Sequence, residues 1–192
     1  MNKYLVVGLG NIGIDYDHTR HNIGFDVADA FVQKQAISFR IDRLAEVAEM
    51  KLKGRPVICI KPSTYMNLSG KAVKYWQDKE RVATENILII LDEVALPLDR
   101  LRLRPSGSSG GHNGLKSIEE YLLTDTYPRL RFGVGNNYPK GMQVEYVLGK
   151  WNKDEFPLVQ KKAAICTDLI ETFILQGIAP AMNQFNKLSI TL

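Results

Sequence analysis

The sequence predicts a single α/β domain over residues 1–192, built on a central mixed, mostly parallel, twisted β-sheet that is flanked by helices. Strand and helix patterns interleave along the chain, which is typical of a sheet with helices packed on its faces. Residues 4–7 and 86–91 form nearly continuous apolar runs, as expected of strands that are covered on both faces. A length of 192 residues suits one domain with one core.

The remaining elements follow from apolar periodicity and from turn residues. A hairpin is predicted where Lys53-Gly54-Arg55 separates two strand patterns, and Pro62 is expected to stop the second strand. Asn22 is expected to cap the first helix. Strands are predicted over residues 3–8, 45–53, 56–61, 86–91, 99–104 and 129–134, with a short extended piece over 144–148 and an ambiguous segment over 37–43; helices are predicted over residues 23–32, 69–82, 115–123, 154–174 and 179–186.

The sequence shows no targeting or membrane-spanning pattern, so a cytoplasmic protein is the default expectation. No run approaches the roughly 18 consecutive apolar residues of a membrane span. The N-terminus leads straight into a predicted strand and lacks a signal-peptide pattern. Cys59 and Cys166 lie far apart in apolar surroundings, and we expect small buried side chains there, not a disulfide or a metal site.

The net charge of +4 is small, but the basic residues are unevenly distributed. They gather in the middle third of the chain, where acids are few, near a glycine-rich segment over residues 105–114 that we expect to be a flexible loop. A basic face beside such a loop can hold a phosphate backbone. Scattered solvated side chains are the plainer interpretation, and charge alone leaves both open. The residues are Arg100, Arg102, Arg104, Lys116, Arg129, Arg131, Lys140 and Lys150.

A glycine-rich turn follows the first predicted strand and leads into a cluster of polar side chains. Its Gly8-x-Gly10-x-x-Gly13 spacing fits a dinucleotide-binding fingerprint, which would make the chain a nicotinamide-dependent oxidoreductase. That motif needs a helix that opens on its last glycine, and an acidic residue closing a second strand about 20 residues further on. Residues 15–21 are a poor first helical turn, so we interpret the glycines as a sharp turn at a strand end.

Four predicted loops place polar side chains after strands: Asn11 with His21, Asn67, Asp92, and His112 with Asn113. Strand-end loops gather at one rim of an α/β sheet, so these groups can converge. A carboxylate bonded to an imidazole fixes its tautomer and raises its basicity, which leaves the other ring nitrogen to take a proton from water. Amide side chains can bind a carbonyl oxygen or its oxyanion. The set indicates hydrolysis of an activated carbonyl, such as an ester, with His21 at its centre.

Other chemistries are less well supported. The sequence has no Gly-x-Ser-x-Gly elbow for a serine nucleophile, and neither cysteine lies near a polar motif. His18 and His21 have a spacing that suits a metal on a helix, but the local sequence is not convincingly helical and no further histidine or cysteine pair lies nearby. Taken alone, His21 is better explained as a hydrogen-bonded structural histidine, and each asparagine as a turn or cap residue; only their joint placement in loops that follow strands favours a site.

Three long blocks carry these polar groups. The first is Gly8-Leu-Gly-Asn with Tyr16 and Thr19-Arg-His-Asn-x-Gly-Phe25; the second is Lys61-Pro-x-Thr-Tyr-Met-Asn-Leu-Ser-Gly70; the third is Gly110-Gly-His-Asn-Gly-Leu-Lys-Ser117. At these residues the chain resembles bacterial-type peptidyl-tRNA hydrolase. Asp92 and Arg129-Leu-Arg-Phe-Gly-Val-Gly135 follow the same order and spacing, so the resemblance covers nearly the whole chain.

The resemblance implies an esterase that releases tRNA from peptidyl-tRNA by cutting the ester between the peptide, an N-blocked aminoacyl group, and the 3′-terminal ribose. It implies a monomer that uses no metal and no cofactor. By motif position, His21 would be the general base, Asp92 would stabilise its basic form, and Asn11 would help to distinguish blocked from free aminoacyl groups. Tyr16, Tyr65, Asn67 and Asn113 would contact substrate, Met66 would line the peptide groove, and Arg102, Arg104 and Arg131 would be candidates to hold tRNA phosphates.

Two positions depart from the family pattern. Ile12 stands where the family usually has proline, and Ala95 stands where a second aspartate is common after the strand that ends at Asp92. Neither departure removes a presumed catalytic group. A non-catalytic RNA-binding relative is the main alternative; the intact set of His21, Asp92 and Asn67 argues against it, and a turnover assay separates the two.

Overall fold

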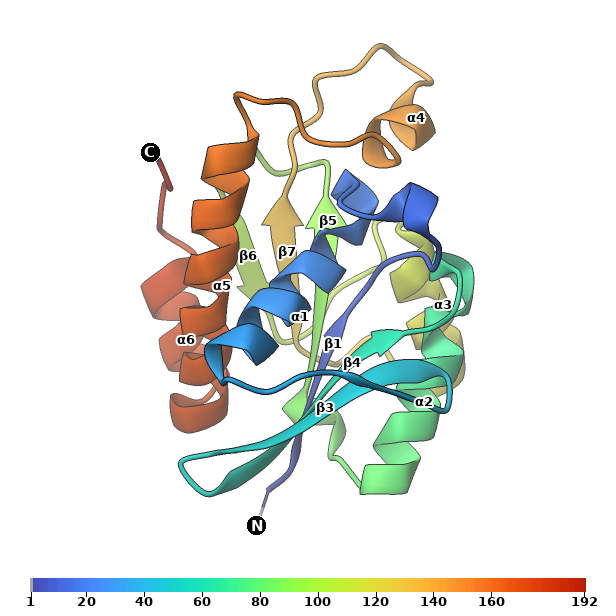
Figure 1. Ribbon diagram of the computed structural model, residues 1–192, viewed down its shortest axis with the longest axis vertical. Coiled ribbons are helices and arrows are strands. Elements are labelled where there is room, and N and C mark those ends of the chain that lie inside the picture. Colours follow the sequence, from blue (N-terminus) through green and yellow to red (C-terminus); the bar gives the residue numbers. More distant parts are fainter. Residues whose placement is uncertain (1) are drawn as a thin grey trace.

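In the computed structural model, which describes residues 2–192, helices cover both faces of one mixed β-sheet (Figure 1). Over these residues the sheet has seven strands in the order β2-β3-β4-β1-β5-β7-β6. The four central strands, β4, β1, β5 and β7, are parallel, and the strands outside them are antiparallel to their neighbours. The predicted fold class is confirmed. The strands are β1 (Tyr4–Gly8), β2 (Arg40–Asp42), β3 (Ala45–Leu52), β4 (Arg55–Pro62), β5 (Ile87–Glu93), β6 (Leu101–Arg104) and β7 (Arg129–Gly133).

The helices form a layer on each side of this sheet. Helices α1, α5 and α6 pack on one face around Phe31, Phe132 and Phe173, whereas α2 and α3 pack on the other face around Trp76 and Tyr127. These two apolar clusters bury the two faces of β1, β4 and β5, which is why β1 and β5 are apolar without alternation. The helices are α1 (Ile23–Lys34), α2 (Ser69–Glu80), α3 (Asn113–Leu122), α4 (Gln143–Val147), α5 (Phe156–Gln176) and α6 (Ile178–Phe185), with 3₁₀ turns η1 (Ile14–Tyr16), η2 (Arg20–Asn22), η3 (Met66–Leu68) and η4 (Thr84–Asn86).

The parallel strands direct their carboxyl ends to one end of the molecule. The arrowheads of β5 and β7 point toward the end at which α4 lies in Figure 1. The loops that follow β1, β4 and β5 therefore emerge side by side, and the start of α3 lies beside them. This arrangement is the expected one for a site at the strand ends of an α/β sheet.

The predicted elements are confirmed with small shifts at their ends, apart from one. Residues 144–148 are expected to be extended, but residues 144–147 belong to the short helix α4 and Leu148 follows its end. A five-residue apolar segment fits one helical turn as well as a strand, and local periodicity does not separate the two. The ambiguous segment over residues 37–43 contains the edge strand β2. Cys59 and Cys166 are buried and unpaired, as expected.

Two other expectations concern helix starts and membrane segments. Asn22 occupies the N-cap position of α1, but its side chain makes no capping bond and is used elsewhere. No helix opens on Gly13, since η1 is a single 3₁₀ turn and α1 begins at Ile23, so the dinucleotide fingerprint lacks its helix. Within the described residues, no helix has both the length and the apolar character that crossing a bilayer requires.

Helix α1 packs against the sheet with its backbone, and this contact places the residues just before it. A Cβ atom on Gly8 would lie 2.1 Å from the Gly24 carbonyl oxygen. A Cβ atom on Gly24 would lie 2.4 Å from the Leu9 nitrogen and 2.5 Å from the Ile90 carbonyl oxygen. Only glycine fits at either position, because the neighbouring atoms are backbone atoms that cannot move aside. The start of α1 is thus held against β1 and β5.

We expect Gly24→Ala to lower the free energy of unfolding by about 1–3 kcal/mol or more, because the added methyl group forces α1 away from the sheet. Urea denaturation measures this change. Gln33→Ala, on the exposed side of the same helix, is the matched control and should stay within about 0.5 kcal/mol of the parent. Equal stability of the two variants would contradict the proposed contact.

Candidate active site

A cleft of about 370 Å³ opens at the carboxyl end of the parallel strands. Its floor and walls come from the segments after β1, β4 and β5, from the start of α3 and from α4. Segments far apart in the sequence thus meet as the sequence patterns predicted. The residues that line it are Asn11, His21, Met66, Asn67, Asp92, Glu93, Val94, Gly110, Gly111, His112, Asn113, Gln143, Val144, Val147 and Leu148.

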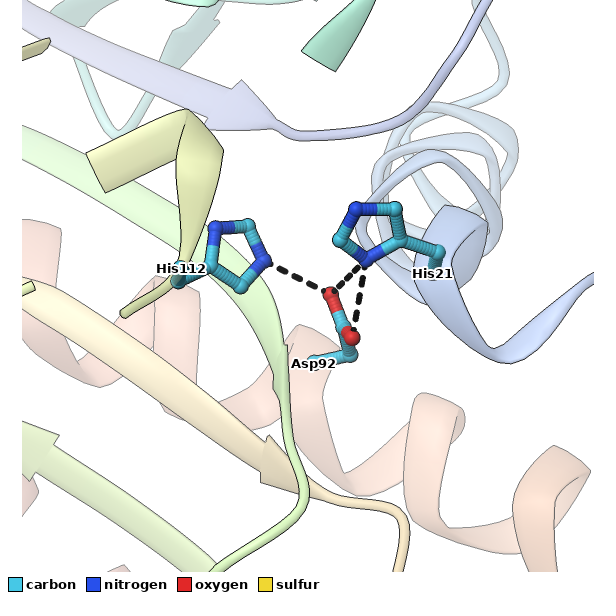
Figure 2. Close-up of side chains that lie close together, drawn as sticks. All are labelled: His21, Asp92 and His112. Atoms are coloured by element: carbon cyan, nitrogen blue, oxygen red, sulfur yellow. Dashed lines mark hydrogen bonds and ion pairs between the residues drawn. The ribbon is translucent and has the colours of Figure 1, made fainter. Parts of the chain in front are cut away.

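A buried carboxylate between two histidines lies in this cleft. The Asp92 side chain is 3% exposed, at the end of β5. His21 Nδ1 lies 2.9 Å from both carboxylate oxygens, and His112 Nε2 lies 2.8 Å from Oδ1. Figure 2 shows the two rings approaching Asp92 from opposite sides, His21 from the η2 turn before α1 and His112 from the segment before α3. The structure therefore unites His21 with Asp92, as predicted, and adds a second imidazole.

The second imidazole is fixed in one tautomer by the helix that follows it. His112 is the N-cap residue of α3, and its Nδ1 accepts a hydrogen bond from the Gly114 backbone N–H at 3.1 Å. An accepting nitrogen carries no proton, so the ring proton of His112 must sit on Nε2, where it is donated to Asp92. His112 is thus held as a hydrogen-bond donor to Asp92 through Nε2. His21 differs, because Nδ1 donates to Asp92 and Nε2 has no protein partner among the described residues.

The protonation equilibria follow from this geometry. Burial alone would raise the pKa of Asp92. The charge interactions and hydrogen bonds with His112 and His21 outweigh the effect of burial and hold that pKa well below its ordinary range. Burial alone would lower the pKa of His21, but the charge of Asp92 and the hydrogen bond to it raise that pKa above its ordinary value of 6.5. Asp92 is therefore ionised at neutral pH, and His21 is a stronger base than a free imidazole.

A metal at this cluster is disfavoured by the donor set. One ligand atom each from His21, Asp92 and His112 lies within 4.8 Å of the others, which is close enough to suggest an ion. A metal ligand needs a free lone pair, however, and the capping bond to Gly114 places the proton of His112 on the nitrogen that faces Asp92. The short contacts are explained as hydrogen bonds to a carboxylate.

Asn11 is held by a small network of its own. The Asn22 side chain accepts from the Asn11 N–H and donates to the Asn11 carbonyl, both at 2.9 Å. Asn11 Oδ1 accepts from the Met66 N–H at 2.7 Å, across the gap between the loops after β1 and β4. The amide is therefore fixed, and among the described residues its Nδ2 has no protein partner. The side chain of Asn22, expected to cap α1, holds Asn11 instead.

The other predicted substrate contacts divide into two groups. Met66, Asn67 and Asn113 line the cleft with Asn11. Tyr16 and Tyr65 are not among the lining residues: Tyr16 ends η1 and is half-buried, and Tyr65 is 54% exposed just before η3. The two tyrosines thus lie outside the lining of the cleft, whereas the amides and the methionine are part of it.

The predicted phosphate-binding arginines also differ from one another. Arg102 and Arg104 alternate with the buried Leu101 and Leu103 on the edge strand β6, and both are exposed. Arg131 is 9% exposed, and its guanidinium bonds Glu93 at 3.0 Å and the Ser108 carbonyl oxygen at 2.7 Å. Its hydrogen-bonding capacity is thus directed inward, toward the loop after β6.

That loop, residues 105–111, forms one wall of the cleft and rests on β7. Arg129 Nη1 bonds the Gly107 carbonyl at 2.6 Å, next to the bond between Arg131 and Ser108. The loop then reverses direction at Gly110 and Gly111, whose φ angles of +58° and +86° favour glycine. Two basic side chains that the sequence grouped with the phosphate-binding residues therefore shape this loop and so place His112.

His112 is the functional residue that sequence reasoning undervalued. The sequence patterns predict one histidine, His21, beside Asp92, whereas in the structure both His21 and His112 bond this carboxylate. The available signal was the Gly-Gly-His-Asn-Gly segment before a predicted helix, where a histidine can act both as a cap and as a partner for a buried acid. The two departures from the family pattern lie outside this cluster: Ile12 is 38% exposed, and Ala95 is exposed after β5.

Comparison with known proteins gives the same family from sequence and from structure. A model of the family described as peptidyl-tRNA hydrolase matches residues 5–191. Peptidyl-tRNA hydrolase of Phocaeicola vulgatus is 50% identical over 185 residues, which is 96% of this chain and 99% of that protein. Peptidyl-tRNA hydrolase of Cytophaga hutchinsonii is 51% identical over 187 residues, which is 96% of this chain and 98% of that protein.

Solved structures with the same name superpose on nearly the entire chain. The crystal structure of peptidyl-tRNA hydrolase from Acinetobacter baumannii has a TM-score of 0.91 at 34% identity, covering 98% of this chain and 96% of that one. A complex of peptidyl-tRNA hydrolase with N-propanol has a TM-score of 0.92 at 33% identity, with the same coverage. The chain described here belongs to the peptidyl-tRNA hydrolase family, and it is an enzyme that hydrolyses the ester bond of peptidyl-tRNA.

Proposed function

We propose that the cleft is the catalytic site and that His21 activates water to cleave the ester between the peptide and the 3′-terminal ribose of tRNA. The observation that carries this proposal is the pair formed by His21 Nδ1 and the buried carboxylate of Asp92. Because Nδ1 donates its proton to Asp92, the lone pair of Nε2 is left for a water molecule in the cleft. Asp92 then stabilises the imidazolium that forms when water loses its proton.

His112 assists by completing the hydrogen bonds of Asp92. Its ring donates to Oδ1 through Nε2, and its Nδ1 is occupied by the Gly114 N–H. A carboxylate that is buried and bonded on both sides is held in one orientation, and it keeps the His21 ring in one orientation in turn. We therefore assign proton transfer to His21 and positioning to His112.

Amide groups around the cleft bind the carbonyl groups of the substrate. Asn67 and Asn113 lie on its lining, and Asn113 begins α3, whose positive helix end favours negative charge. We propose that these amides stabilise the oxyanion of the ester carbonyl as water attacks. Met66 provides apolar surface beside them, and Tyr16 and Tyr65 contact the substrate from the rim.

Asn11 distinguishes a blocked aminoacyl group from a free one in this scheme. Its Oδ1 is taken by the Met66 N–H, so Nδ2 is the group that can bond the substrate. An N-blocked group offers a carbonyl oxygen that accepts from Nδ2. A free aminoacyl group offers an ammonium, which has no lone pair to accept with.

The tRNA is held outside the cleft by basic side chains. Arg102 and Arg104 project from the same face of the edge strand β6, since residues two apart share a side of a strand. We propose that they contact tRNA phosphates. Arg131 contributes through the shape of loop 105–111, because its guanidinium already bonds Glu93 and Ser108.

We further propose that the chain acts as a monomer and as one functional domain, with no metal or cofactor in the reaction. The cytoplasm is the proposed location, because peptidyl-tRNA arises in translation. A non-catalytic RNA-binding role is not favoured by any particular observation, since the cleft contains a base, its carboxylate and the amides together.

His21→Ala should lower turnover of an N-acetylaminoacyl-tRNA by roughly 10²–10⁴-fold, the usual contribution of a general base, while the protein stays folded at the assay temperature. The assay uses blocked and unblocked aminoacyl-tRNA side by side. His18→Ala is the matched control: this histidine lies three residues earlier, its side chain is 70% exposed, and activity should be retained. Normal turnover by His21→Ala would defeat the assignment.

The acid limb of the pH profile should report the raised pKa of His21. Activity needs the neutral ring, so kcat/KM should fall as the pH drops through a value above 6.5. In Asp92→Asn the burial of the ring remains but the charge is gone, so the limb should move to lower pH while the maximal rate also falls. Steady-state kinetics across pH measures both, and an acid limb that stays in place would contradict the role of Asp92.

Removal of the arginines that hold phosphates should weaken tRNA binding and flatten its salt dependence. For Arg102→Ala combined with Arg104→Ala, the slope of log affinity against log salt should become less steep by about 0.7–0.9 for each phosphate that is no longer neutralised. Arg131→Ala should disturb loop 105–111 with a smaller change in slope. Lys51→Ala, an exposed change on β3, serves as the control, and an unchanged slope in the double variant would exclude β6 as the tRNA face.

A further inference from the structure

Arg20 is a buried arginine next to His21 that the mechanism above does not use. Its side chain is 10% exposed. The guanidinium bonds three groups that all lie in a distant part of the chain: the carbonyl oxygens of Tyr146 and Lys150, at 3.2 Å and 3.1 Å from Nη1, and the Glu155 carboxylate, at 2.9 Å from Nη2. A planar group with a fixed fork of donors is suited to holding several acceptors in one geometry.

Aromatic side chains enclose the same guanidinium. Its central carbon lies 4.2 Å from the centre of the Tyr146 ring and 5.1 Å from the centre of the Trp151 ring. Such contacts are worth more when the cation is shielded from water, as it is here. Tyr146 is therefore fixed to Arg20 twice, through its carbonyl and through its ring.

The backbone reinforces this attachment. The Arg20 N–H bonds the Gly149 carbonyl at 3.0 Å, and Thr19 forms an isolated antiparallel bridge with Lys150. Gly149 lies so close that a Cβ atom on it would be 3.1 Å from Arg20 Nη1. The chain on the carboxyl side of α4 thus rests directly on the residue that precedes the catalytic histidine.

This attached segment is a wall of the cleft. Gln143, Val144, Val147 and Leu148 line the cavity together with His21 and its partners. The segment also bonds the rest of the protein through the Tyr146 hydroxyl, which donates to the Val134 carbonyl at 2.6 Å. Arg20 supplies the larger share of these polar attachments, and it does so from the residue adjacent to the base.

We propose that Arg20 is a positioning residue for the reaction, which fixes the α4 wall of the cleft at a set distance from His21. This inference rests on the proposed function of the cleft. A peptide bound against α4 is thereby held at a fixed position relative to the imidazole. Arg20 itself contacts neither the attacking water nor the substrate in this proposal. Loss of the attachment is expected to weaken substrate binding while leaving the proton-accepting group intact.

Arg20→Lys tests the proposal, because lysine keeps the charge but cannot make the forked set of bonds or stack in the same way. We expect KM for N-acetylaminoacyl-tRNA to rise about tenfold or more with kcat changed less than about threefold, the signature of weakened ground-state binding. The acid limb of the pH profile should stay in place. Amide hydrogen exchange over residues 143–149 should accelerate, whereas exchange in β1 should not.

Arg55→Lys is the matched control. Arg55 is half-buried and bonds the Ile174 carbonyl of α5, which lies outside the cleft lining, so neither KM nor exchange over residues 143–149 should change. Glu155→Gln removes the charged partner of Arg20 and should shift KM and exchange in the same direction by a smaller amount. This second variant provides the answer if Arg20→Lys does not fold.

Two results would overturn the proposal: unchanged exchange over residues 143–149 in both variants, or accelerated exchange with unchanged KM. The first would mean that Arg20 does not hold the wall, and the second that the position of the wall does not matter for substrate. Failure of the proposed function looks different, because there His21→Ala would retain turnover. The two ideas are therefore separable in one set of assays.

Discussion

A buried carboxylate that must remain ionised is the constraint on which the rest of the site depends. Asp92 ends a strand that is covered on both faces, where an unpaired charge would be costly. Removing one partner from such a group typically costs about 3–5 kcal/mol, so both imidazoles are held firmly in place. The same requirement that stabilises the charge thus orients His21, raises its pKa and leaves its outer nitrogen toward the cleft.

The two histidines reach this carboxylate through different structural devices. His21 is placed by the close approach of α1 to the sheet, which needs glycine at positions 8 and 24. His112 is placed by loop 105–111, which two buried arginines hold on β7, and its tautomer is set by a capping bond in α3. The second nitrogen of His112 is occupied by a hydrogen bond from the Gly114 N–H, whereas the second nitrogen of His21 has no protein partner among the described residues. The two rings therefore differ in the surroundings of their second nitrogen.

The segments around the cleft form a connected set. Asn22 holds Asn11, and Asn11 holds the Met66 backbone, so the loops after β1 and β4 move together. Arg20 joins the η2 turn to the segment after α4 in a similar way. Both attachments start from residues adjacent to His21. His21 and the two residues that hold the neighbouring loops thus share one short stretch of chain, which explains why that stretch is dense in polar side chains.

The sequence by itself determined the fold class, the strands and most helices, and it predicted that His21, Asp92, Asn67 and Asn113 come together, as they do in the lining of one cleft. Apolar runs and strand-end loops report burial and topology directly, because both depend on local pattern. Tertiary structure alone decided three things: the helical state of residues 143–147, the inward direction of Arg131, and the pairing of His112 with Asp92. Each of these features depends on a partner that is distant in the sequence. The local sequence around a short apolar turn, an arginine or a histidine does not identify that partner, so local patterns cannot predict the outcome.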